Sequence, residues 1–187
     1  MGYRVFVSRP IPKDWLSPLI KAQDIEVVIY ENPKGLHEAV WLEALKGYDG
    51  ILSFVPDRFT RDLLQKRGER LKVLSNFSVG YDNIDIEAAS ELGIVVTITP
   101  DVLSQTTAEM AWALLFAVSR RIVEGDRMMR SGKFEGFSPT LLLGREIAGK
   151  TLGLVGAGRI AMKVAMISKA FSLELLYCAT KRNPIFE

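Results

Sequence analysis

The chain has 187 residues, of which 48% are hydrophobic and 25% charged, and its formal net charge is +2. This is ordinary globular composition for one or two domains, and without a basic block it gives no indication of nucleic-acid binding. One cysteine, Cys178, excludes an internal disulfide and is typical of a reducing compartment. The N-terminus lacks the pattern of a signal peptide, and the longest apolar run, Met110–Val118, is too short to cross a bilayer. We therefore expect a soluble, cytoplasmic protein without membrane or nucleic-acid partners, and no metal site is predicted.

Strand and helix patterns alternate through the first hundred residues. Short runs rich in Val, Ile and Leu are typical of buried parallel strands, and the segments between them carry apolar residues at helical spacing. Five such repeats predict a flavodoxin-like, doubly wound α/β domain over residues 1–98. The expected strands are Tyr3–Ser8, Ile25–Tyr30, Gly50–Phe54, Leu71–Asn76 and Ile94–Ile98. A first helix is expected where Trp15, Leu16, Leu19 and Ile20 form one apolar face. The other expected helices are Leu36–Lys46, Phe59–Lys66 and Ile84–Leu92.

A linking segment over residues 99–150 follows this domain. Thr106 and Glu109 match a capping box, which predicts that a long helix begins there and continues to about Arg130. The helix breakers Gly136, Pro139 and Gly144 then predict a loop over Phe134–Arg145.

The most informative stretch begins at Thr151. Leu152, Leu154 and Val155 form a run typical of a buried strand, and the helical stripe of Ile160, Val164 and Ile167 follows. Between them, Gly156, Gly158 and Ala161 have the spacing of a dinucleotide-binding turn, in which glycines let a pyrophosphate approach the helix N-terminus. A further strand over Leu173–Cys178 completes a β-α-β pattern. Residues 151–187 are therefore predicted to be a partial Rossmann domain, and the alternative is an ordinary glycine turn.

Three motifs in this order carry a family resemblance. They are Asn76–Asp85, Thr107–Leu114, and Gly149–Gly153 leading into the glycine turn. Over about Tyr3–Pro184 the sequence resembles the D-isomer-specific 2-hydroxyacid dehydrogenases, in particular the glyoxylate/hydroxypyruvate reductase and phosphoglycerate dehydrogenase branch. The resemblance implies hydride transfer between NAD(P) and a small 2-keto or 2-hydroxy acid, in a cleft between a substrate domain and a nucleotide domain.

The resemblance also implies where the substrate lies. The backbone amides of Val79 and Gly80 would grip the substrate carboxylate, and the loop that starts with Ser53 and Phe54 would border the same pocket. The alternative for Val79 and Gly80 is a plain turn at the end of a strand.

Cofactor contacts are implied in the same way. Arg159 and Ile160 would touch the pyrophosphate beside Gly156 and Gly158, and Thr107 would lie near the nicotinamide. Thr107 can instead be only a helix cap, and Arg159 only a solvated residue of the first helical turn.

The residues after the second Rossmann strand bear on cofactor choice. NAD enzymes place an acidic residue there to bind the ribose 2′-hydroxyl, whereas this chain has Thr180, Lys181 and Arg182. Two adjacent cations could meet a 2′-phosphate, which favours NADP over NAD. The alternative is an exposed basic turn.

The sequence stops nine residues after Cys178. The resemblance implies that the family's catalytic Arg, Glu and His come from later parts of the chain, and the one histidine here, His37, is expected at a solvated position of an N-terminal helix. We therefore expect a C-terminally truncated dehydrogenase that is inactive alone, or alternatively a non-catalytic remnant or assembly partner. The resemblance also implies that the segment from about Thr107 to Gly149 binds a second subunit, so we expect a homodimer or larger assembly with residues 151–187 packed against another copy. A disordered tail after Lys150 is the alternative.

Overall fold

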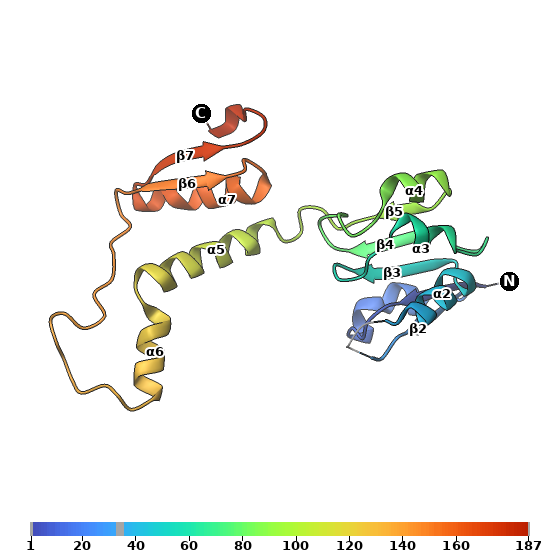
Figure 1. Cartoon of the computed structure of the whole chain (residues 1–187), viewed down its shortest axis with the longest axis horizontal. Helices are drawn as coiled ribbons and strands as arrows, with labels where there is room; N and C mark the ends of the chain where they lie inside the picture. Colours follow the sequence, from blue (N-terminus) through green and yellow to red (C-terminus); the bar gives the residue numbers. More distant parts are fainter. Residues whose placement is uncertain (1, 33–35, 187) are drawn as a thin grey trace. The chain divides into compact units, whose positions relative to one another are not determined.

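A computed structural model describes residues 2–32 and 36–186. The chain forms two compact units, Met1–Pro100 and Asp101–Glu187 (Figure 1). The substrate, linking and nucleotide-binding roles assigned to segments 1–98, 99–150 and 151–187 remain predictions.

The first unit is built on a five-stranded sheet in which every pairing is parallel. Its strand order, β2-β1-β3-β4-β5, is the flavodoxin-like order and confirms the predicted fold class. The strands are β1 Tyr3–Val7, β2 Ile25–Ile29, β3 Gly50–Phe54, β4 Val73–Phe77 and β5 Val95–Thr97.

One row of apolar side chains crosses this sheet and forms the base of the core. Phe6 lies opposite both Val28 and Ile51, Ile51 lies opposite Leu74, and Leu74 lies opposite Val96. Phe6, Ile51 and Leu74 belong to the buried core cluster, and Val28 and Val96 are partly buried against it. The cluster also takes buried side chains from three helices. Because one face of each strand carries this row, the strand register is fixed by burial.

The three helices that cover the row are α2 Glu38–Gly47, α3 Arg61–Gln65 and α4 Ile86–Glu91. They are shorter than predicted, and capping side chains set the starts of α3 and α4. Thr60 accepts a hydrogen bond from the backbone of Leu63, and Asp85 accepts one from Ala88. The predicted start of the Leu36–Lys46 helix was wrong, because His37 is extended and precedes α2. His37 is exposed, as expected.

The opposite face of the sheet is less covered. The short elements η1 (Lys13–Leu16) and α1 (Ser17–Ile20) follow β1. Leu16 is buried, but Trp15 and Ile20 are exposed, so the predicted apolar face of this helix is only partly used. Trp15 instead stacks on Phe77 at the end of β4.

A charged contact fixes the amino-terminal edge of the sheet. The carboxylate of Asp49 accepts hydrogen bonds from the Arg4 backbone and the Arg70 guanidinium, each at 2.8 Å. These donors, with Arg70 the strongest, hold the pKa of the Asp49 carboxyl below its ordinary value. The contact lies at the end of the strands opposite to the polar loops described below.

The second unit contains a parallel pair, β6 Thr151–Val155 and β7 Glu174–Cys178, joined by α7 Arg159–Ser168. It begins with α5 Ser104–Ser119 and α6 Ile122–Arg130. Residues 134–145 carry no helix or strand, as predicted. The rings of Trp112, Phe116 and Phe171 pack together, and the Trp112 indole donates to the carbonyl of Val164 in α7 at 3.1 Å. These contacts join α5 to α7.

The predicted capping box of α5 was wrong. The helix begins at Ser104, two residues before Thr106, and the Thr106 hydroxyl donates to the Leu103 carbonyl. Glu109 accepts from Gln105 along the helix, so it does not cap the start. The predicted continuation to Arg130 is also interrupted, because Arg121 adopts a left-handed conformation with φ of 54° and separates α5 from α6.

The prediction that β6 is buried was wrong as well. No residue of β6 or β7 is buried, and Val155 is 99% exposed. A crossover helix covers one face of a parallel pair, which leaves Leu152 and Leu154 half-buried and the other face open. Ile160, assigned to the packing stripe of α7, is exposed at the start of the helix. Among the described residues, no helix is both long and apolar enough to span a membrane.

Candidate functional site

The loops that follow β3 and β4 lie together at the carboxyl edge of the five-stranded sheet. The two strands are neighbours, with Ser53 opposite Asn76 and Phe54 opposite Phe77. In open parallel sheets, ligands bind outside the carboxyl ends of the strands. The first candidate site is therefore built from these two loops.

Two asparagine side chains tie the loops to each other. The Asn76 amide donates to the Gly80 carbonyl and to the Asn83 side-chain oxygen, both at 3.0 Å. The Asn83 amide donates to the Asp57 carbonyl at 2.7 Å and also reaches the Phe54 carbonyl at 3.4 Å. Asn83 thus joins the second loop to the first, and Asn76 at the end of β4 holds Asn83 in place, so the pair holds the loops at one separation.

A buried carboxylate, that of Asp57, anchors the first loop to the sheet. Asp57 is only 3% exposed and accepts hydrogen bonds from the Ser8 hydroxyl, the Arg9 guanidinium and the Phe54 backbone. Arg9 also forms an ion pair with it at 2.9 Å. A buried charge is tolerated when it is paired and hydrogen-bonded, so this cluster rigidifies the loop after β3.

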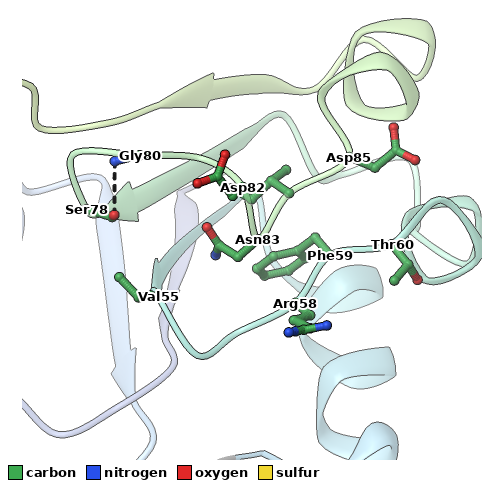
Figure 2. Close-up of a pocket in the computed structure, with 10 residues that line it drawn as sticks. Val55, Arg58, Phe59, Thr60, Ser78, Gly80, Asp82, Asn83 and Asp85 are labelled. Carbon is green, nitrogen blue, oxygen red and sulfur yellow. Dashed lines mark hydrogen bonds between the residues drawn. The ribbon is translucent and has the colours of Figure 1, made fainter. Parts of the chain in front are cut away.

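Figure 2 shows the pocket of about 580 Å³ that opens between the two loops. Val55, Arg58 and Thr60 reach it from the first loop, and Gly80 and Asp82 from the second. Arg58 is exposed and is the one cation among the residues described as lining the pocket, which also include the carboxylates of Asp82 and Asp85. A small anion such as a carboxylate could pair with Arg58, against the repulsion of these two carboxylates.

The four predicted substrate residues lie at different depths around this pocket. Gly80 lines it, and its N–H donates to the Ser78 hydroxyl at 3.1 Å. Ser53 is fully buried and its hydroxyl donates to Asn76 at 3.1 Å. Phe54 packs on the ring of Phe77, and Val79 is half-buried; neither belongs to the lining. Of the four, Gly80 alone already faces the pocket.

The glycine turn of the second unit has the geometry that a phosphate site needs. Gly156 has φ of 99°, a conformation that side chains rarely allow, and a Cβ added at Gly156 or Gly158 would meet nothing within 4 Å. The first amide to bond within α7 is that of Met162, which donates to the Gly158 carbonyl. The preceding amides, from Arg159 onward, are those that a helix N-terminus offers to an anion.

A second pocket of about 610 Å³ lies over this turn. Gly158 and Arg159 line it, together with Asp101, Gln105 and Lys163. Arg159 forms an ion pair with Asp101 at 3.0 Å. The other predicted cofactor residues lie outside its lining: Thr107, Gly156, Ile160, Thr180, Lys181 and Arg182.

The segment after β7 folds back toward the same turn. The Asn183 side chain donates to the Ala157 carbonyl at 2.8 Å, and its backbone donates to the Tyr177 hydroxyl at 3.2 Å. The residues before it, Thr180, Lys181 and Arg182, are exposed. The basic residues are therefore carried by a segment that is tied to the glycine turn.

Sequence reasoning missed the polar residues that hold these sites. Asn76, Asn83 and Asp57 were not singled out, nor was the pairing of Asp101 with Arg159. A signal did exist, because Asn76 interrupts an apolar strand where a polar side chain has to find a partner. The partners themselves are distant in sequence, so the sequence does not show them.

A five-stranded parallel unit followed by a β-α-β glycine turn defines a class of dinucleotide-binding α/β proteins. A family model described as the catalytic domain of D-isomer specific 2-hydroxyacid dehydrogenases matches residues 5–181. The chain belongs to this family.

Known relatives agree with that assignment. The chain is 40% identical over 188 aligned residues to a glyoxylate reductase from Thermococcus litoralis, covering 98% of this chain and 56% of the relative. It resembles the crystal structure of the TT0316 protein from Thermus thermophilus, with a TM-score of 0.90 and 40% identity over 97% of this chain and 57% of that one. It also resembles an acyclic imino acid reductase solved with NADPH and D-Arg, with a TM-score of 0.81 and 29% identity over 98% and 58%. The chain thus spans little more than half the length of these proteins.

The asparagine pair yields a first prediction. Replacing Asn83 by Ala removes the donor to the Asp57 carbonyl and leaves Asn76 with fewer partners. We expect a loss of about 1–3 kcal/mol in the free energy of unfolding and faster amide exchange in residues 53–57 and 78–83. Chemical denaturation and hydrogen exchange measure these effects. Gln65→Ala, at an exposed amide of the same unit, is the matched control, and equal behaviour of the two variants would show that the pair does not hold the loops.

Proposed function

We propose that the chain carries the substrate-carboxylate site and the pyrophosphate site of an NAD(P)-dependent 2-hydroxyacid dehydrogenase. The observation that supports this best is the open space above Gly156 and Gly158, at the start of a helix, in a chain that belongs to this family. The substrate class is a small 2-keto acid such as glyoxylate, or the corresponding 2-hydroxy acid. We further propose a cytoplasmic location, consistent with the single cysteine.

The open space at the turn before α7 leaves room for a pyrophosphate. We assign Gly156, Gly158, Arg159 and Ile160 to the pyrophosphate, and Thr107 to the nicotinamide end. When bound, the cofactor supplies or accepts the hydride. The chain's own residues hold the phosphates through first-turn amides of α7 and the Arg159 guanidinium, whose charge matches the phosphates.

The first unit would bind the carboxylate of the keto acid. We assign this role to the amides of Val79 and Gly80, with Ser53 and Phe54 bordering the pocket. Because the Gly80 N–H donates to Ser78, a substrate carboxylate would replace that hydroxyl as acceptor. The loops are already held by Asn76 and Asn83, so little ordering is needed when the substrate binds.

Reduction of a keto acid also needs a proton donor. The 187 residues include one histidine, His37, which is exposed before α2 and has no place in either pocket. We therefore propose that these 187 residues alone do not turn over, and that the acid–base group of an active enzyme lies outside them. The alternative is a non-catalytic protein that binds and assembles.

A turnover assay separates these two functions. With glyoxylate or hydroxypyruvate and either cofactor, the 187-residue polypeptide should show no reduction above background. A rate near 1 s⁻¹, within the ordinary enzyme range, would contradict this. Activity that appears only on mixing with a polypeptide equivalent to the remaining part of the Thermococcus litoralis relative would favour the enzyme over the non-catalytic alternative.

We propose NADP as the preferred cofactor, held at its 2′-phosphate by Thr180, Lys181 and Arg182. The support is their exposure on a segment whose Asn183 bonds to the glycine turn. No acidic residue lies among positions 177–182 to bind a ribose 2′-hydroxyl.

Lys181→Gln tests the preference. We expect NADPH to bind more tightly than NADH to the unmodified chain, and the variant to lose about tenfold in NADPH affinity, since a charged hydrogen bond contributes about 1.5 kcal/mol. NADH affinity should not change. Calorimetry or NADPH fluorescence measures this, with Lys13→Gln in the first unit as control. Tight NADH binding without a response to NADPH would overturn the preference.

We propose that the chain forms a homodimer or larger assembly through the segment from about Thr107 to Gly149. Met110, Leu114 and Val118 recur at four-residue spacing on α5 and are 59%, 58% and 79% exposed. Such a stripe lies on one face of a helix, and large exposed apolar patches mark interaction sites. We also propose that residues 151–187, with the open face of β6 and β7, pack against another copy.

Leu114→Asp should therefore convert the assembly to a monomer, because a buried unpaired carboxylate is costly. Sedimentation at micromolar concentration measures the mass. Ile20→Asp, at a 48% exposed position of the first unit, should leave the assembly intact. A monomeric unmodified chain with a well-protected C-terminal segment would contradict the proposal.

A further inference from the structure

The guanidinium assigned to the pyrophosphate already has an anionic partner. Arg159 Nε lies 3.0 Å from Asp101 Oδ1, and both residues line the pocket above the glycine turn. Their side chains are 70% and 59% exposed. A ligand entering this pocket therefore meets a cation that a carboxylate partly neutralises.

The position of Asp101 is set by its backbone. It has φ of 67°, in the left-handed region, and its carbonyl accepts from the Ser104 amide at 3.2 Å as α5 begins. Aspartate and asparagine are the side chains that tolerate this conformation best. The carboxylate is thus presented by a defined turn, and asparagine can replace it without changing the backbone preference.

The charges of the pocket lining give this carboxylate a specific effect. Arg159 and Lys163 lie one turn apart on α7, and Asp101 is the single acidic residue among the residues described as lining the pocket. A pyrophosphate would be attracted by the two cations and repelled by Asp101. The Asp101 carboxylate therefore competes with the phosphate for Arg159.

We propose that Asp101 determines how tightly the glycine turn binds phosphate, by occupying Arg159 until a dinucleotide replaces it. This rests on the proposed pyrophosphate site. Binding is then an exchange: the Asp101 carboxylate leaves the guanidinium, and a phosphate oxygen takes its place. Asp101 is a positioning residue, because it acts on the ligand through Arg159.

This exchange predicts that phosphate affinity rises modestly when the Asp101 carboxylate is removed. Exposed ion pairs are weak, so we expect Asp101→Asn to bind inorganic pyrophosphate and NADPH about two- to fivefold more tightly than the unmodified chain. The gain should shrink in high salt, which screens exposed charges. Most of this gain in affinity should also be lost when Arg159 is replaced by Ala, because the carboxylate then has no guanidinium to occupy and only its direct repulsion of the phosphate remains.

The experiment is a double-mutant cycle on the full 187-residue chain. Pyrophosphate and NADPH are titrated by calorimetry against the unmodified chain, Asp101→Asn, Arg159→Ala and the double variant. Asp126→Asn is the matched control, since Asp126 is 53% exposed, pairs with Arg130 at 2.8 Å and lies on α6, outside the pocket lining.

Tighter binding by Asp101→Asn alone, dependent on Arg159, supports the proposal. An equal gain in Asp126→Asn would mean that overall charge is responsible and would overturn it. If the unmodified chain binds and Asp101→Asn binds no better, the proposal fails while the pyrophosphate site stands. If no variant binds pyrophosphate or NADPH, both fail.

Discussion

Both candidate sites depend on one property of parallel strands: all strands of such a sheet end at the same edge. In the first unit this brings the loops after β3 and β4 together, although the two strands end at Phe54 and Phe77, far apart in the sequence. In the second unit it places the glycine turn after β6 beside the segment after β7. The apolar row from Phe6 to Val96 fixes the register that makes the first arrangement possible.

The loops themselves are held by buried polar contacts. Asp57 is held by donors from the end of β1 and from the Phe54 backbone, and Asn76 and Asn83 join the two loops. Buried polar groups that are fully paired rigidify a site, whereas unpaired ones are costly. The second unit differs, because its ion pair between Arg159 and Asp101 is exposed and can exchange for a ligand. The loops of the first candidate site are therefore held in place before a ligand binds, whereas a ligand could replace the ion pair at the second candidate site.

Much of this fold could be predicted from the sequence. Apolar runs of Val, Ile and Leu located the strands of both units, with Gly50–Phe54 matching β3 in full, and the glycine spacing located the turn before α7. Burial could not be predicted, because it depends on what covers a surface: Val155 looks like a core residue and is 99% exposed. The start of α5 also escaped prediction, since Thr106 and Glu109 fit a capping pattern that the chain does not use. The polar pairs of the sites join residues far apart in sequence, which a local pattern does not reveal.

The central claim is that the backbone at the start of α7 receives the dinucleotide phosphates. The most direct measurement is a backbone-amide NMR titration of the chain with NADPH. The claim predicts saturable shifts concentrated at Gly156, Gly158 and the amides from Arg159 to Ala161, with the amides of the five-stranded sheet unmoved. Saturable binding that leaves those amides unshifted, or no binding at millimolar NADPH, would contradict it.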